Sequence, residues 1–170
     1  YVRYLAERGG PFPRRQDMRS GGYYVGTPPP KARKFSLSYG WACQFHPSPS
    51  GSKMRELAAA LEKLGADDGD AVFFDYCALP QNGRAKMPDA YFEANGCKAP
   101  MADKTAAEKQ QFGRALTEMS RVYVFKECEV IVLPGREDPK DFPGGPDAWG
   151  LARAPEDTLG NYERRGWCVS

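Results

Sequence analysis

The side chains of this chain that could do chemistry are polar and aromatic residues near the ends of its apolar segments. We place six of them in one candidate ligand cleft: Ser38, Tyr39, Trp41, Asp75, Tyr76 and Trp167. Asp75 could polarise a ribose hydroxyl, although an acid at a strand end more often caps a turn or accepts a backbone N–H. A tryptophan could stack on a flat nucleobase, although tryptophans of small α/β domains more often lie in a core or interface. The residue types leave both a ligand site and a structural role open.

Histidine and cysteine offer little for metal or nucleophile chemistry. His46 is the single histidine, so a zinc site or a Ser-His-Asp hydrolase has few parts to draw on, and we expect no metal site. A loop histidine without a visible partner is more often structural or solvated than catalytic. The five cysteines form neither a dense disulfide framework nor CxxC pairs, which favours reduced thiols in an intracellular protein: Cys43, Cys77, Cys97, Cys128 and Cys168. Cytoplasm and organelle stay equally open.

Three apolar segments must position these residues. The segments 34–39, 71–76 and 128–134 predict strands, and the apolar spacing over 52–64 predicts a helix between the first two. The capping pattern Thr105-x-x-Glu108 opens a second predicted helix before the last strand. We therefore expect an α/β domain of three layers, with an incomplete parallel sheet of about three strands and the first strand between the other two. The carboxyl ends of such strands form the edge where ligands bind.

The first 34 residues differ in composition from the rest. They hold eight basic and two acidic residues and several Pro and Gly runs, which predicts an extended basic arm before a domain over 35–170. That domain carries two long predicted loops, 82–102 and 134–160. Long loops and ordered arms are often shaped by a partner, so we expect partner contacts from the arm and the second loop. The candidates are Arg14, Arg15, Arg19 and Trp149.

Charge and hydropathy exclude several classes of protein. The 170 residues carry 24 Lys+Arg and 22 Asp+Glu, a net charge of +2, so nothing global marks a nucleic-acid or membrane-surface binder. No apolar run approaches the roughly 20 residues of a spanning helix, so we expect no transmembrane segment. Neither GxGxxG nor GxxxxGK[ST] occurs, which disfavours a protein that binds a flavin or a nucleotide.

Several sequence blocks together resemble the TIR-like (Toll/interleukin-1 receptor-like) proteins of unicellular algae and other protists. The blocks are SYGW at 38–41, HPSPSG at 46–51, FFDYCALPQ at 73–81, VIVL at 130–133 and YxxRGWC at 162–168, with GPFPRRQD at 10–17 upstream. The resemblance covers about residues 10–51, 71–81 and 105–168. It implies a flavodoxin-like sheet and two alternative functions.

The first function implied by the resemblance is a non-catalytic interaction module, an adaptor or accessory subunit of a larger assembly that acts through other subunits or through self-association. The second is cleavage of the nicotinamide–ribose bond of NAD, with NAD as substrate and no resident cofactor. In the cleaving relatives a glutamate lies four residues beyond the tryptophan of a WCxxE block. Here that position would be 171, beyond Ser170, and the long 134–160 loop also departs from the catalytic pattern. We therefore expect the interaction module first and the NAD glycohydrolase as the alternative.

Overall fold

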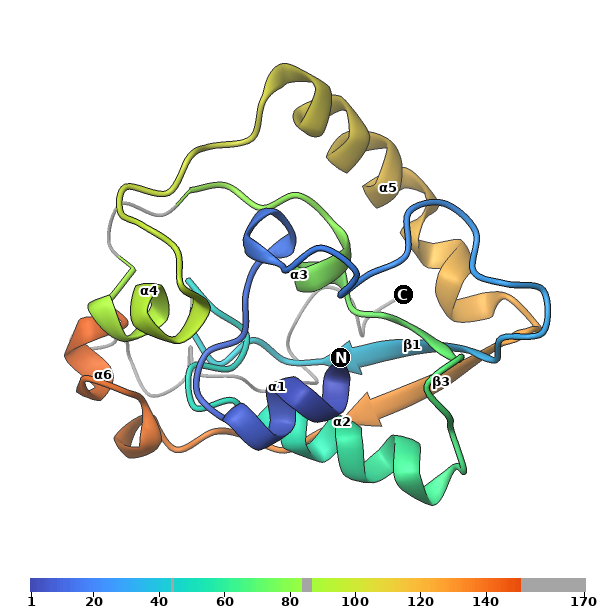
Figure 1. The fold of residues 1–170 in the computed structure, drawn as a ribbon, viewed down its shortest axis with the longest axis horizontal. Helices are drawn as coiled ribbons and strands as arrows, with labels where there is room; N and C mark the ends of the chain where they lie inside the picture. Colours follow the sequence, from blue (N-terminus) through green and yellow to red (C-terminus); the bar gives the residue numbers. More distant parts are fainter. Residues whose placement is uncertain (44, 84–86, 151–170) are drawn as a thin grey trace.

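A computed structural model describes residues 1–43, 45–83 and 87–150 of the chain (Figure 1). Its sheet has three parallel strands in the order β2-β1-β3: β1 (Lys34–Tyr39), β2 (Ala71–Phe73) and β3 (Cys128–Leu133). The predicted α/β class, the parallel sheet and the central place of the first strand are confirmed. The described residues include no helix both long and apolar enough to cross a membrane.

The main core lies on one face of the sheet. Side chains of a strand alternate between faces, so Phe35 and Leu37 of β1 point to the same side, together with Ile131, which is in register with Leu37. That side packs against α1 (Val2–Arg8) and α2 (Ser52–Lys63), whose Leu5, Met54 and Leu57 belong to the same buried cluster. The helix predicted over 52–64 is confirmed. Of the periodic apolar residues that predict it, Met54 and Leu57 are buried in this core and Leu61 packs against it.

The other face of the sheet is thinly covered. Because parallel crossovers are right-handed, the passage from β2 past β1 to β3 puts α5 (Ala106–Val124) on the side opposite α2 (Figure 1). The capping box that begins α5 is confirmed, with the Glu108 N–H 3.2 Å from Thr105 Oγ1. Within α5 only Met119 is buried, and the Tyr123 hydroxyl donates to the Leu37 carbonyl at 3.1 Å.

The two predicted long loops contain helices and form a second core. The loop 82–102 contains α4 (Asp89–Asn95), and the loop after β3 contains η2 (Pro139–Asp141) and α6 (Gly145–Ala148). Residues 151–160 of that loop lie outside the described residues. The second core is made of six buried residues: Cys43, Met87, Tyr91, Met101, Phe142 and Trp149. Both loops are thus tied to one another by apolar packing.

The N-terminal arm differs from the expected extended segment in its first residues. Val2–Arg8 form a helix because their apolar residues can pack on α2, and Leu5 is 2 % exposed. The described arm beyond it holds only one short helical turn, η1 (Arg15–Asp17), as the Pro and Gly runs predict. Phe12 is wholly buried in the main core. The arm is therefore held by its own domain.

The predicted end of the second strand needs correction. The second strand ends at Phe73 rather than 76, because Asp75–Ala78 turn into the short helix α3, in which the Cys77 and Ala78 N–H groups donate to the Phe74 carbonyl. The third predicted strand is confirmed, and of its residues only Ile131 and Leu133 are buried. This strand forms the edge of the described sheet, and α5 leaves its second face open.

Candidate functional site

The carboxyl ends of β1 and β2 bring Tyr39 and Asp75 into direct contact. The Tyr39 hydroxyl donates to Asp75 Oδ1, and the same oxygen accepts the Tyr76 N–H at 2.6 Å. Burial raises the pKa of the Asp75 carboxyl, while the Tyr39 hydrogen bond and the Tyr76 N–H act in the opposite direction. Burial and the Asp75 charge raise the pKa of the Tyr39 hydroxyl well above its usual value. Asp75 therefore makes its hydrogen bonds with Tyr39 and Tyr76 of the same fold, which fits a structural role for this acid.

The aromatic candidates pack edge to face beside this pair. Trp41 and Tyr76 meet with ring centroids 5.6 Å apart at 83°, and Phe12 meets Tyr76 at 5.8 Å and 79°. Tyr76 is 3 % exposed, and burial raises the pKa of its hydroxyl. These contacts place Tyr76 in the core, with Trp41 packed against it.

Ser38 and Trp167 are not brought into this group. Ser38 precedes Tyr39 in β1, so its side chain points to the opposite face of the sheet, where Val132 is its register partner. Trp167 lies outside the described residues. Of the six predicted cleft residues, the structure therefore brings together Tyr39, Trp41, Asp75 and Tyr76.

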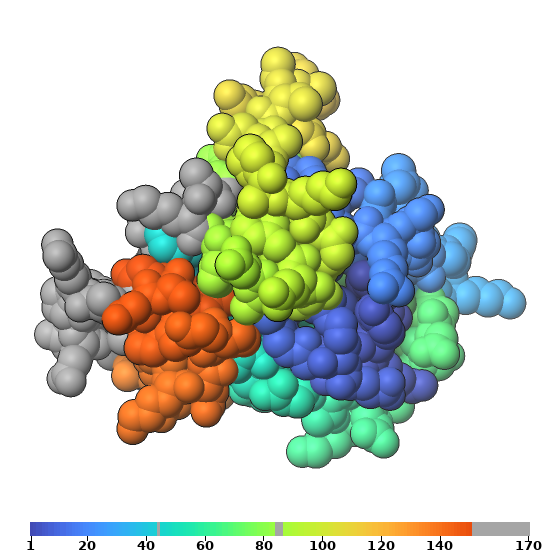
Figure 2. Space-filling view, turned by 60° about the vertical axis from the view of Figure 1, so that its left-hand side comes forward, coloured from blue at the N-terminus to red at the C-terminus, as the bar shows by residue number. Residues whose placement is uncertain are grey.

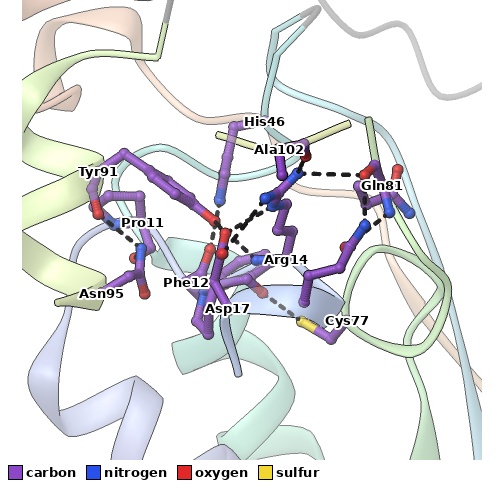
Figure 3. Close-up of polar contacts among 12 residues, drawn as sticks. Pro11, Phe12, Arg14, Asp17, His46, Cys77, Gln81, Tyr91, Asn95 and Ala102 are labelled. Atoms are coloured by element: carbon purple, nitrogen blue, oxygen red, sulfur yellow. Dashed lines mark hydrogen bonds and ion pairs between the residues drawn. The ribbon is translucent and has the colours of Figure 1, made fainter. Parts of the chain in front are cut away.

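His46 is a buried structural residue. Its Nδ1 accepts the Ser48 N–H at 2.9 Å, so the proton is on Nε2, which donates to the Phe12 carbonyl at 2.8 Å (Figure 3). The ring packs against Phe12 and Tyr76 with centroids 4.7 and 4.8 Å away. Burial lowers the pKa of His46 to about 3. A neutral imidazole thus fastens the arm to the loop that follows β1.

Arg14 is buried as well, 3 % exposed, and holds the arm against two distant segments. Its Nε is 2.7 Å from Asp17 Oδ2, and one of its terminal nitrogens donates to the carbonyls of Ala102 at 2.7 Å and Gln81 at 3.3 Å (Figure 3). The η1 turn makes this possible, because it folds Asp17 back toward Arg14, with the Asp17 N–H 3.0 Å from the Arg14 carbonyl. The predicted partner contact of Arg14 is corrected: this guanidinium works inside the fold.

Residues outside the predicted cleft complete this Arg14 network, which we define as Arg14, Gln16, Asp17, Gln81 and Tyr91. The Tyr91 hydroxyl donates to Asp17 Oδ2 at 2.9 Å and accepts the Arg14 N–H at 2.9 Å. Gln16 and Gln81 exchange two hydrogen bonds of 2.7 and 3.0 Å. The Arg-x-x-Asp spacing could have indicated the ion pair, whereas no local pattern indicates Tyr91.

The remaining partner candidates divide between surface and core. The Arg15 guanidinium lies 3.8 Å from the Tyr23 ring centroid, and that of Arg19 lies 5.1 Å from the Tyr4 ring centroid. Trp149 is wholly buried, and its Nε1 donates to the Pro143 carbonyl at 2.8 Å. The predicted partner contact of Trp149 is therefore corrected too, because its indole fills the second core.

The sequence analysis also missed the carboxylate of Glu137. This residue follows β3 in the chain, and its side chain contacts the first residue of α2 and the loop before it. It accepts the Ser52 hydroxyl at 2.7 Å and the Ser50 N–H at 3.1 Å, and it also accepts the Ser48 hydroxyl. The first turn of a helix favours such an anion. Glu137 therefore ties the segment after β3 to the segment after β1.

The described ranges hold no group of three or more His, Cys, Asp or Glu side chains placed to bind a metal ion. Four cysteines in these ranges are free thiols: Cys43, Cys77, Cys97 and Cys128. Burial raises the pKa of the Cys77 thiol, whose sulfur donates to the Pro13 carbonyl at 3.4 Å. The chain matches no protein-family model, no curated protein and no solved structure.

Proposed function

We propose that this chain is a non-catalytic protein–protein interaction module, an accessory subunit of a larger assembly. The observation that carries the proposal is a set of exposed apolar residues on two neighbouring elements, α5 with the residue that follows it, and β3. We call it the α5–β3 surface, and its residues are Leu116, Val124, Phe125, Val130 and Val132. Val124 is 81 % exposed and Phe125 54 %, although both are large apolar side chains. Large apolar side chains exposed on neighbouring elements support a surface that another protein covers.

Two acids at the start of β3 are already paired within the chain. Glu129 pairs with Arg33 at 3.1 Å and Glu127 pairs with Lys34 at 3.4 Å, so the acids at the start of β3 are already balanced within the chain. The side chains of Val130 and Val132 share one face of the strand. A partner subunit with an apolar face could bury this surface without breaking either ion pair.

The candidate cleft supports the non-catalytic half of the proposal. A catalytic carboxylate must reach its substrate, and Asp75 instead accepts bonds from Tyr39 and Tyr76. His46 has both ring nitrogens engaged with backbone groups. The resemblance to TIR-like proteins agrees with an adaptor role and remains part of the proposal.

The test compares the native mass of the protein before and after the α5–β3 surface is made polar. The natural protein, tagged in its own cells, is sized in extract as wild type, as Val124→Ser/Phe125→Ser, and as Lys109→Ser/Gln110→Ser. The last variant is a control that changes exposed polar residues of the same helix. We expect the wild type and the control in an assembly and the double serine variant at monomer mass.

Three results would contradict the proposal. The first is a wild-type protein that runs as a monomer, and the second is a serine variant that keeps the assembly. The third is release of nicotinamide from NAD by the purified natural protein, which would make it an enzyme.

A further inference from the structure

A second surface of this chain combines arginine and tyrosine. We call it the Arg/Tyr surface, and its residues are Tyr1, Tyr4, Arg15, Arg19 and Tyr23. The rings of Tyr1 and Tyr4 stack with centroids 5.6 Å apart, and Arg19 lies over Tyr4. Arg15 lies over Tyr23. Tyr1 also lies against Gly22, where an added Cβ would be 3.0 Å from its ring, so α1 and the residues near 22 form one continuous face (Figure 2).

The two arginines of this face differ from the nearby Arg3 and Arg14 in their ion pairing. Arg3 pairs with Asp68 at 3.7 Å and Arg14 with Asp17 at 2.7 Å. Within the described residues, no carboxylate forms an ion pair with Arg15 or Arg19. Arg19 is exposed and Arg15 half-buried. The face therefore presents two cations that form no ion pair with a carboxylate in the described part of the chain.

Stacking on tyrosine prepares these cations for binding. A guanidinium that lies over a ring has fewer orientations to lose, and it can still pair with both oxygens of a carboxylate. Tyrosine and arginine are also the residues that dominate the binding energy of protein interfaces. We propose that the Arg/Tyr surface binds an acidic peptide segment of a partner protein, with Arg15 and Arg19 each pairing with a carboxylate.

This inference rests on the proposed function, because it names the chemistry of a partner, but it concerns residues remote in sequence from the α5–β3 surface. The observations favour a peptide over a nucleic acid. The rings of Tyr4 and Tyr23 already carry a guanidinium, which leaves less ring surface for a base to stack on. The net charge of +2 is also low for a protein that follows a phosphate backbone.

The test measures fluorescence anisotropy of a labelled ten-residue peptide of alternating Glu and Ser at low ionic strength. We expect the natural protein to bind it and not the same peptide with Gln in place of Glu. Arg15→Gln/Arg19→Gln should weaken binding on the order of tenfold, since two charge-assisted pairs are lost. The matched control is Arg114→Gln/Arg136→Gln, which removes two exposed arginines elsewhere and should leave the affinity unchanged.

A second pair of variants separates stacking from folding. Tyr4→Phe/Tyr23→Phe keeps both rings and should bind as the wild type does, whereas Tyr4→Ala/Tyr23→Ala should bind more weakly with an unchanged circular dichroism spectrum. Equal binding by the Arg15→Gln/Arg19→Gln variant, or no binding by the wild type, would overturn the inference. So would tighter binding of a ten-nucleotide oligouridine than of the acidic peptide. The Val124→Ser/Phe125→Ser variant leaves the Arg/Tyr surface unchanged, so it should bind the peptide as the wild type does. A failure of the proposed function can therefore be told apart from a failure of this inference.

Discussion

At the scale of single residues, the side chains that could have taken part in catalysis make their hydrogen bonds within the fold. His46 holds the Phe12 carbonyl and the Ser48 N–H, and Asp75 holds the Tyr39 hydroxyl. Each was open to a functional or a structural reading from sequence, and the contacts favour the structural one. Such buried groups keep the protonation state that their partners require.

His46 should remain neutral far below its ordinary pKa of 6.5, because burial lowers the pKa to about 3. The unfolded chain takes up a proton at this histidine between those pH values and the folded chain does not. The stability that depends on neutral His46 is therefore complete above pH 6.5 and is lost as the pH falls toward 3, by at most about 1.4 kcal/mol per pH unit. Since the chain has one histidine, the proton NMR titration of its ring reads this group alone. A midpoint near 6.5 in the folded protein would refute the assignment.

Asp75 should tolerate loss of its charge better than loss of its oxygen. Burial raises its pKa above 3.8, so the folded chain holds the proton at higher pH than the unfolded chain, and stability falls as the pH rises through that window. Asp75→Asn keeps an oxygen for Tyr39 and Tyr76, so at pH 7 we expect stability equal to or above that of the wild type. Asp75→Ala leaves the Tyr39 hydroxyl without its partner, at about 1–3 kcal/mol. Urea unfolding of both variants decides: an Asn variant as weak as the Ala variant would mean that the charge itself is needed.

At the scale of elements, local patterns predicted what depends on local chemistry. The leucine spacing of α2 and the Thr105–Glu108 capping box gave both helices, and the apolar runs gave all three strands. Elements that depend on distant contacts were missed or misjudged. The helix α1 forms against α2, and β2 is short because Asp75 and Tyr76 begin a turn.

The candidate site shows the same division. The position of Asp75 and Tyr39 at neighbouring strand ends followed from the order of strands and helices, because parallel strands end at one edge. The burial of Arg14 and Trp149 did not follow, since both are held by residues far away in the chain or by a core that only folding assembles. The charge of Arg14 alone suggested a surface role, but a carboxylate three residues later in the chain, Asp17, pairs with it inside the fold.

Arg14 should be essential for docking the arm, because its side chain and that of Asp17 are only 4 % and 12 % exposed. Arg14→Met leaves Asp17 buried without its cation, and we expect a loss of about 3–5 kcal/mol. Adding Asp17→Asn should restore part of that loss. Arg15→Met changes an arginine next in sequence without a buried carboxylate and is the control. Chemical unfolding of the four proteins measures these differences, and equal stability of the Arg14 and Arg15 variants would contradict the buried network.

At the scale of the whole molecule, the described residues cover one face of the sheet more fully than the other. The arm, α1 and α2 cover one face of the sheet, while α5 leaves Val130 and Val132 exposed on the other. The Arg/Tyr surface adds Arg15 and Arg19, which follow α1 in the chain and form no ion pair among the described residues. A module that joins other subunits through an apolar surface and an acidic contact accounts for both.

The most direct test of this account is hydroxyl-radical footprinting of the purified chain and of the same protein in its native assembly. Leu116 on the α5–β3 surface and Leu64 at the end of α2 form a matched pair, since they are 39 % and 37 % exposed. We predict that labelling of Leu116 and Phe125 falls several-fold in the native assembly while labelling of Leu64 stays the same. Unchanged labelling of Leu116 and Phe125 would show that no partner covers this surface and would contradict the interaction module.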